Sequence, residues 1–416
     1  MGDCVRINKR IVVAVILIAA ALTAVVLAFF ALNGEWMFRS EPQRHKPTVN
    51  LEKKPIESRT ALTEELCRNA LETDGQKAAY ETISDYINRS ENERFRLYSS
   101  DTNEFQIALN AYLSDHPEVF WLDDSSSYRY YEYDDSLDVE LIFTQTGEEL
   151  SQNKASLEAA VEKVAGDAPD IADDYEIELY LNDWFTENCS YNTDGGNKHS
   201  AYGALINGEA VCDGYSHAFQ LLCNRLGVTC TVVEGTSEFN SDAEDGHMWN
   251  CVKLGESWYH IDVTWNDSSN AECGVEHYFY VNLNDEQIAL DHSVSGGFDQ
   301  RFNNKGNYFN VFLPKCDSDE LNWFRLNGVV ISDPDDDDEP VAALIEAAKN
   351  RDAYFACVID EKADFNAVCD KIIDGCAVSW IKGANHFLGG DPKISEDEKI
   401  FSYESKRVLA LQLKYE

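Results

Sequence analysis

The spacing of apolar residues after Cys212 predicts a buried helix that begins at this cysteine. Apolar side chains recur in steps of four, three and four residues, at Tyr215, Phe219, Leu222 and Leu226. Such steps place side chains on one face of an α-helix, and the glycine at position 227 is a typical C-terminal stop. We therefore expect Cys212 in the first turn, where unpaired N–H groups and the positive end of the helix dipole favour a thiolate.

The next segments predict strands. Residues 228–234 (VTCTVVE) are β-branched, as is typical of a strand. Residues 247–254 and 257–265 are two further strand-like segments, separated only by Gly255-Glu256. A two-residue connection of this kind predicts a tight β-hairpin.

The register of this hairpin brings two polar side chains together. Pairing across the turn places Trp249 opposite Asp262 and His247 opposite Thr264, all on one face of the sheet. His247 and Asp262 are then diagonal neighbours, about 7–8 Å apart by backbone and within side-chain reach. A slip of one residue would send one strand's side chains to the other face and break the arrangement.

A cysteine, a histidine and an aspartate on separate elements are the parts of a thiol nucleophile, its base and the group that orients the base. We expect Cys212 to attack a carbonyl carbon, His247 to protonate the leaving amine and Asp262 to hold the imidazole. The backbone N–H of Cys212 is a candidate oxyanion donor. Tyr202 and His199, upstream of the nucleophile, are further candidates for the oxyanion site or the cleft.

Four segments resemble the transglutaminase-like superfamily, whose cores share the papain-like plan of a cysteine helix packed on an antiparallel sheet. The segments are 199–208 (HSAYGALING), 210–216 (AVCDGYS), 247–250 (HMWN) and 258–265 (WYHIDVTW). The resemblance is closest to bacterial surface proteins with this domain and covers roughly residues 60–330. It implies that Cys212, His247 and Asp262 are the catalytic triad. The family includes transferases, peptidases and inactive members, so the resemblance implies the fold but does not decide the reaction.

Simpler interpretations remain open for several of these residues. Cys212 is one of twelve cysteines, and free cysteines are often buried structural residues. His260 is a rival base, because it lies on the same predicted face, opposite Cys251. Trp249 and Trp265 fit a core or the wall of a cleft.

The N-terminal region predicts a membrane anchor. Residues 11–32 form an uninterrupted apolar run, long enough to span a bilayer as a helix. Basic residues in the preceding segment 1–10 favour a cytoplasmic N-terminus, with the bulk of the chain extracytoplasmic at the cell membrane. A cleaved signal peptide is the alternative. Residues 33–60 are polar and predict a flexible stalk.

The net charge of −41 argues against nucleic acid as a partner. No P-loop, no strand-linked dinucleotide motif and no EF-hand loop is present, so we expect no cofactor and no metal, although the charge leaves Ca²⁺ open. The cysteines contain no CxxC pair. In an exported chain Cys223/Cys230 and Cys369/Cys376 are candidate disulfides, with free buried thiols as the alternative.

The expected fold class is α+β, with a transglutaminase-like (papain-like) core and flanking modules. Residues 61–150 predict an N-terminal α/β segment and 151–330 the catalytic domain. An acidic linker at 331–340 (SDPDDDDEP is its core) precedes a small α+β accessory module at 341–416. In that module we expect helices at 340–349 and 365–373, and strands at 354–359, 377–381 and 408–415. We expect the module to bind the cell wall or a surface partner.

These features predict a membrane-anchored extracytoplasmic thiol enzyme. It would form an acyl-enzyme on Cys212 from a peptide or protein substrate and pass it to water, as a cysteine peptidase or amidase does. One alternative is transfer of the acyl group to an amine, as in transglutaminase crosslinking. A second alternative is a non-catalytic surface adhesin or scaffold with the same fold.

Overall fold

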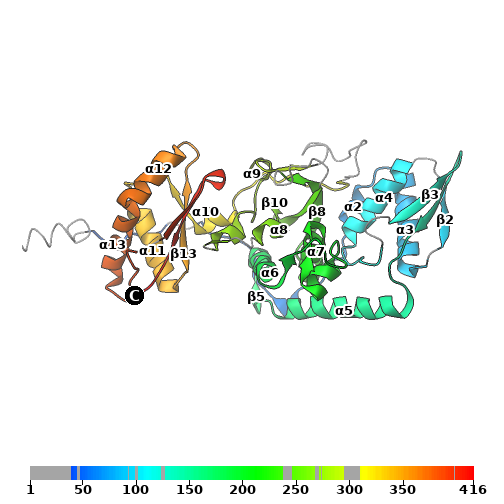
Figure 1. The fold of residues 1–416 in the computed structure, drawn as a ribbon, viewed down its shortest axis with the longest axis horizontal. Coiled ribbons are helices and arrows are strands. Elements are labelled where there is room, and N and C mark those ends of the chain that lie inside the picture. The colour runs from blue at the N-terminus through cyan, green and yellow to red at the C-terminus, as the bar shows by residue number, and fades with distance from the viewer. Residues whose placement is uncertain are drawn as a thin grey trace, which may run out of the picture. The chain divides into compact units, whose positions relative to one another are not determined.

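The computed structural model describes residues 39–44, 47–91, 93–98, 102–122, 127–237, 246–267, 271–272, 274–294, 310–397 and 399–416. The chain forms two compact units, one of residues 47–326 and one of residues 327–416 with the described part of 1–46. Both units combine helices with sheets (Figure 1).

Among the described residues, no helix has both the length and the hydropathy needed to cross a bilayer. The apolar run 11–32 and the tail 1–10 lie outside the described residues. The membrane anchor therefore stays a prediction.

The predicted stalk at 33–60 differs from the structure where it is described. Residues Lys54–Pro55 (β1) pair with Ile171–Ala172 (β5). The Arg59 side chain is only 3% exposed and donates to the Asp174 carboxylate at 2.7 Å. The two terminal nitrogens of this buried guanidinium donate to Asp174 and to the carbonyl oxygens of Leu226 and Ala172, which ties the stretch to the first unit. Polar composition alone did not reveal this.

The first unit contains both the predicted N-terminal segment and the predicted catalytic domain. Its helices are α2 (Leu66–Ala70), α3 (Asp74–Arg89), α4 (Thr102–Asp115), α5 (Gly147–Gly166), α6 (Asp174–Asn188), α7 (Cys212–Arg225), α8 (Val263–Asn266), α9 (Asp285–Ile288) and α10 (Trp323–Asn327). Its remaining strands are β2 (Arg94–Leu97), β3 (Tyr128–Glu132), β4 (Leu137–Leu141), β6 (Ser190–Tyr191), β7 (Glu209–Ala210), β8 (Cys230–Ser237), β9 (His247–Leu254), β10 (Ser257–Ile261) and β11 (His292–Val294).

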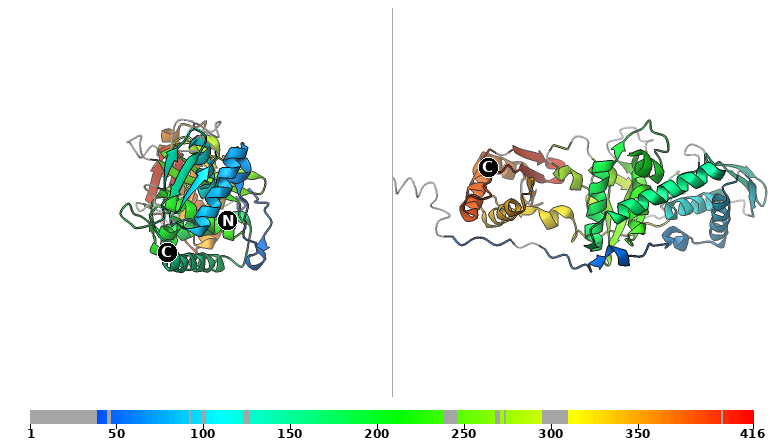
Figure 2. Two further views of the ribbon diagram at one scale, coloured as in Figure 1. Left: turned by 90° about the vertical axis from the view of Figure 1, so that its right-hand side faces the viewer. Right: turned by 90° about the horizontal axis from the view of Figure 1, so that it is seen from below.

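A four-stranded antiparallel sheet of order β10-β9-β8-β11 forms the centre of this unit. Helix α7 packs against β8 and β9, and the 20-residue helix α5 packs against α7 in turn (Figure 2). The predicted helix is confirmed: its apolar face is buried, and the residue after its C-cap, Gly227, has a φ of +74°. A left-handed backbone there favours glycine and ends the helix.

The predicted hairpin register is confirmed, but its second strand is shorter than expected. Leu254 pairs with Ser257 and Asn250 with Ile261. The strand then ends, because the Asp262 side chain accepts hydrogen bonds from the backbone N–H groups of Thr264 and Trp265. Residues predicted as the end of a strand therefore form the short helix α8, capped by the aspartate.

The second unit contains the strands β12 (Val329–Ile331), β13 (Tyr354–Ile359), β14 (Lys399–Tyr403) and β15 (Val408–Gln412), in the order β12-β13-β15-β14. Its helices are α11 (Asp338–Asn350), α12 (Phe365–Lys371) and α13 (Ala377–Leu388). The predicted linker 331–340 does not separate the two units, because β12 and the start of α11 already belong to the second one.

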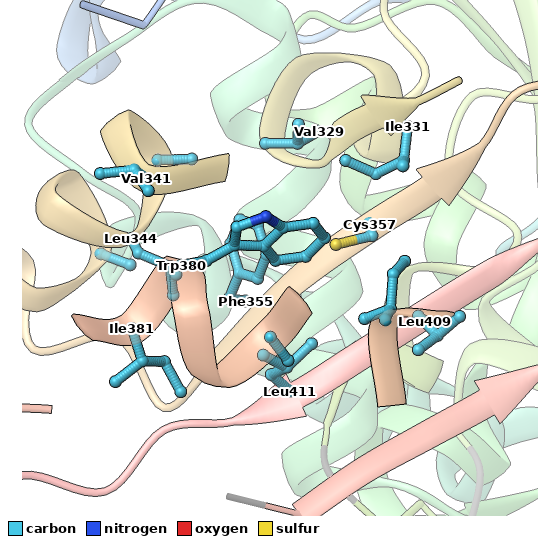
Figure 3. Close-up of a cluster of buried hydrophobic side chains, with 14 of the residues drawn as sticks. Val329, Ile331, Val341, Leu344, Phe355, Cys357, Trp380, Ile381, Leu409 and Leu411 are labelled. Carbon is cyan, nitrogen blue, oxygen red and sulfur yellow. The ribbon is translucent and has the colours of Figure 1, made fainter. Parts of the chain in front are cut away.

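The predicted strand at 377–381 was wrong, since these residues open α13. Ala377, Trp380, Ile381 and Ala384 are buried, with the spacing of one helix face. Figure 3 shows Trp380 among the apolar side chains of β12, β13 and β15. A five-residue apolar run fits a strand or a helix equally well, and only its continuation to Leu388 decides between them.

Candidate active site

Cys212 is the first residue of α7 and is partly buried. The preceding Val211 has an extended backbone and contributes no side-chain cap. The Gly214 N–H donates to Asp213 Oδ1 at 3.0 Å, so the N–H groups of Cys212 and Asp213 are the candidates for a ligand or an anion at this helix start. Gly214 is needed in this turn because a Cβ there would lie 2.3 Å from the carbonyl oxygen of Lys198.

Two side chains hold the first turn of α7 on the strand that begins with His247. The Ser216 hydroxyl lies 2.8 Å from the carbonyl oxygen of Cys212 and 3.0 Å from that of Met248. The Asn250 side chain donates to the carbonyl oxygen of Ser216 at 3.0 Å. Buried hydrogen bonds of this kind fix the geometry between nucleophile and base.

His247 and Asp262 form a buried pair. His247 Nε2 donates to Asp262 Oδ2 at 2.6 Å, and the two side chains are 5% and 0% exposed. The other carboxylate oxygen accepts the capping bonds from Thr264 at 2.9 Å and Trp265 at 3.0 Å. Burial opposes the charge of Asp262, but the imidazoles beside it hold its pKa well below the ordinary carboxyl value.

The third member reaches the same imidazole. The Cys212 side chain is near enough to His247 to raise the pKa of its imidazole. Asp262 already occupies Nε2, so Nδ1 is the nitrogen that remains for the sulfur. Burial lowers the pKa of His247, but Asp262 and Cys212 outweigh burial and raise this pKa to about 9. The imidazole is therefore protonated at neutral pH, next to the sulfur.

His292 is a residue of this site that sequence reasoning missed. Its Nε2 lies 3.0 Å from Asp262 Oδ2, and its Nδ1 lies 2.7 Å from Asp291 Oδ1. The side chain is fully buried, and the two carboxylates raise its pKa against the opposing effect of burial. His292 stands on β11, which joins the sheet through β8. No local pattern relates it to Asp262, 30 residues earlier.

The two tryptophans take different positions. The Trp249 ring is fully buried and stacks on His247 at a centroid distance of 5.9 Å. The Trp265 ring is only partly buried and lies 5.7 Å from His247 and 4.5 Å from His292. Trp249 is thus a core residue behind the histidine, and Trp265 packs against both imidazoles.

The proposed oxyanion candidates are engaged elsewhere. His199 Nδ1 lies 2.7 Å from Asp213 Oδ2. The Tyr202 hydroxyl donates to Asn153 on α5 at 3.2 Å. Their roles as oxyanion or cleft residues stay predictions, as does that of the Cys212 N–H.

The rival base, His260, belongs to a second cluster inside the sheet. Its Nε2 lies 3.0 Å from Asp285 Oδ1. Its Nδ1 lies 3.2 Å from Cys251 Sγ and 3.0 Å from Trp249 Nε1. His260 is fully buried, so these contacts direct it to Cys251 and not to Cys212.

Two groups of side chains in the described residues bring metal-ligating atoms within 4.8 Å of one another. One is His247, Asp262 and His292, whose proximity follows from the hydrogen bonds above. The other is Cys251, His260 and Cys316, with 3.7 Å between the sulfurs. The ten described cysteines are free thiols, including those of the two candidate disulfides.

Part of the chain matches a known protein family. Residues 159–263, about a quarter of the chain, match the family model of the transglutaminase-like superfamily. That segment includes all three predicted triad residues. Kyphoscoliosis peptidase of Mus musculus and that of Homo sapiens are each 36% identical over 61 residues, which is 13% of this chain and 9% of theirs. The match thus spans about a tenth of the length of these curated relatives.

Two solved structures show remote similarity. A TGase is 14% identical with a TM-score of 0.25, covering 45% of this chain and 56% of its own. The periplasmic domain of TgpA from Pseudomonas aeruginosa is 14% identical with a TM-score of 0.21, covering 35% of this chain and 65% of its own.

Proposed function

Since residues 159–263 form a transglutaminase-like domain, we propose that this protein is a thiol enzyme that forms an acyl-enzyme on Cys212. The substrate is a peptide or amide, and the acyl group passes to water. One observation carries the proposal: Cys212 begins a helix beside His247, whose pKa it helps to raise, and His247 Nε2 lies 2.6 Å from Asp262 Oδ2. Anchoring in the membrane through residues 11–32, with the enzyme outside the cytoplasm, is a further part of the proposal and rests on sequence.

The reaction follows from these positions. The Cys212 sulfur attacks the carbonyl carbon as a thiolate and forms a C–S bond. His247 then gives its proton to the leaving nitrogen as the C–N bond breaks, which leaves a thioester. In the second half His247 takes a proton from water, the water oxygen bonds to the acyl carbon and the C–S bond breaks. The carboxylic acid leaves and the thiol is restored.

The electrostatics suit the first half of this cycle. A general acid must be protonated before it acts, and the pKa of His247, about 9, keeps it so at neutral pH. Asp262 remains an anion because its own pKa is held low, so it fixes the imidazole without competing for the proton. His292 is the positioning residue that contacts Asp262 Oδ2, the same oxygen that His247 uses.

Hydrolysis is favoured over transfer to an amine by the position of Trp249. A deep, dry cleft between Trp249 and Trp265 would exclude water and favour transfer. Trp249 is instead buried in the core, with no exposed surface to line such a cleft. Against a non-catalytic scaffold, burying two imidazoles around one carboxylate costs desolvation energy that hydrophobic packing would avoid.

The proposal is tested by trapping the intermediate. The purified protein is mixed with a p-nitrophenyl ester, and its intact mass is measured within the first turnover. We expect one acyl group on wild-type protein, mapped by peptide digestion to Cys212 and absent in Cys212→Ser. Cys376→Ser, at the other partly exposed cysteine, is the matched control and should still acylate. No adduct, or an adduct that persists in Cys212→Ser, would refute the proposal.

The fate of the acyl group is measured separately. A glutamine-containing peptide is incubated with the enzyme and a fluorescent primary amine. Release of ammonia without incorporation of the amine supports hydrolysis. Fluorescence in the peptide would show that the acyl group passes to the amine and not to water.

A further inference from the structure

A cavity of about 200 Å³ lies against the first turns of α7. Asp213, which follows Cys212, and Met248, which follows His247, both line it. Its wall also includes His217 of α7 and Glu234 of β8. The cavity is therefore one residue away from both the nucleophile and its base along the chain.

Two polar groups in this wall have no partner among the described residues. Glu234 lies directly opposite Met248 in the β8–β9 pairing, and no described group donates to its carboxylate. Burial, reinforced by the negative charge of Asp213, raises the pKa of Glu234 to about 8. The buried Nδ1 of His217 likewise has no hydrogen-bond partner within the described residues. Burial lowers the pKa of His217, so this imidazole is neutral.

The charges around the cavity are unbalanced. Asp213 is paired with His199 at 2.7 Å. His116 also lines the cavity, but its Nδ1 lies 3.1 Å from Glu118. No lysine or arginine is among the described residues of the wall. Glu234 is partly buried and has no fixed cation among the described residues, which disfavours its charged form.

We propose that this cavity is a subsite for a primary ammonium group carried by the substrate. The link to Cys212 rests on the proposed function. An ammonium group has three N–H donors and no acceptor, and the wall offers the acceptors it needs, the Glu234 carboxylate and His217 Nδ1. Pairing would favour the charged form of Glu234 and satisfy the buried His217 Nδ1.

The size of the cavity limits what it holds. Pockets for whole drug-sized ligands have volumes of about 300–1,000 Å³, whereas this one has about 200 Å³. It fits a single extended side chain or a short alkylamine. The ammonium group is that of a lysine-like side chain next to the scissile amide, or that of an amine that accepts the acyl group.

The test uses two alkylating reagents with the same electrophile and chain length. Aminopentyl iodoacetamide ends in an ammonium group, and hexyl iodoacetamide ends in a methyl group. Each rate at Cys212 is divided by the rate with plain iodoacetamide in the same protein variant. We expect the cationic reagent to react about tenfold faster at Cys212, the size of one charge-assisted hydrogen bond, and Glu234→Gln to abolish this preference.

Controls separate the cavity from the general negative charge of the protein. The ratio at Cys376, which has Asp333, Asp335 and Asp337 nearby, reports the non-specific attraction of a cation and should stay well below the ratio at Cys212. Glu256→Gln removes a charge from the exposed hairpin turn and should keep the preference at Cys212. Ser127→Lys adds a cation to the cavity wall and should remove the preference even if Glu234→Gln proves unstable. Equal rates of the two reagents at Cys212 in folded wild-type protein would overturn the proposal.

A failure of the proposed function would look different. If Cys212 reacts with neither reagent, the enzyme assignment fails, and the cavity is then tested by calorimetric titration with butylammonium and with butanol. Binding of the cation alone, lost in Glu234→Gln, supports the subsite. Absence of binding by the cation refutes it. Two outcomes separate the sources of the ammonium group. If the amine is incorporated into an acyl donor, the cavity binds the amine that accepts the acyl group. If a lysine peptide is cleaved faster than its norleucine analogue, the cavity binds a substrate side chain.

Discussion

The hairpin of β9 and β10 belongs to two sets of thiol, imidazole and carboxylate. In the first, Cys212 acts on the pKa of His247, which lies 2.6 Å from Asp262. In the second, Cys251 lies 3.2 Å from His260, which lies 3.0 Å from Asp285. The residue types and their order are the same in both sets.

The surroundings differ. Cys212 is partly exposed at a helix start, where unpaired N–H groups can stabilise a thiolate and an oxyanion. Cys251 is completely buried in the middle of a strand, with the Cys316 sulfur 3.7 Å away. A substrate reaches the first sulfur and not the second. The same three residue types occur in both sets. The candidate active site is therefore distinguished by the helix start at its cysteine and by the exposure of that cysteine to solvent.

The strongest way to break this comparison is to remove each sulfur in turn. Cys212→Ala should abolish ester hydrolysis, by about 10⁴-fold or more, because the nucleophile is lost. Cys251→Ala should keep the activity within about a factor of three and lower the free energy of unfolding by about 1–2 kcal/mol, as a small core deletion does. Steady-state kinetics and urea unfolding measure the two effects. Loss of activity in a folded Cys251→Ala protein would reverse the assignment of the two sets.

The two histidines give the next largest contrast. His247→Ala should reduce ester hydrolysis by about 10²–10⁴-fold, the usual contribution of a general acid and base. His260→Ala should leave the rate per folded molecule unchanged but lower stability by about 3 kcal/mol, because it leaves Asp285 and buried polar groups unpaired. If both substitutions reduced the rate equally, His260 would have to be restored as a candidate base.

Asp262→Asn should reduce the rate by about 10²-fold and change the dependence of stability on pH. The raised pKa of His247 contributes stability that is complete below its unfolded value, near 6.5, and is lost as pH rises through about 9. The lowered pKa of Asp262 contributes stability above about pH 4 that is lost as pH falls. In Asp262→Asn the free energy of unfolding should therefore depend less on pH at both the acid and the alkaline end. Urea unfolding at a series of pH values measures this. An unchanged dependence on pH would show that the pair does not form in solution.

The smallest effect is expected from His292→Phe. Asp262 then loses one of its two imidazole partners, and we expect about a tenfold loss of rate. The alkaline limb of the pH–rate profile should move upward from its position near pH 9, because Asp262 would interact with His247 alone. A profile that stays in place would make His292 only a structural residue.

The sequence alone predicted how His247 and Asp262 come together, because two local patterns determine their positions. The apolar periodicity after Cys212 fixed a helix start, and the two-residue turn at Gly255-Glu256 fixed the register of the hairpin. Together they brought His247 and Asp262 within reach without any distant contact. Asp262 as a helix cap was missed, because its capping partners follow a β-branched run that equally fits a strand.

Other features depend on contacts that no local pattern encodes. His292 joins Asp262 only because β11 pairs with β8 across the chain. The ordered stretch near Arg59 depends on partners far along the sequence, including Asp174. The acidic run at 331–340 suggested a linker by composition, yet its ends fold into β12 and α11, whose apolar residues pack into the core of the second unit.

The most direct test of the central claim is the rate of alkylation by iodoacetamide at pH 6, followed by peptide mapping. An ordinary thiol is almost entirely protonated and slow at this pH. We expect Cys212 in wild-type protein to react about 10²-fold faster than Cys376, and His247→Ala to remove that advantage. Equal rates at Cys212 and Cys376, or an advantage that survives in His247→Ala, would contradict the account.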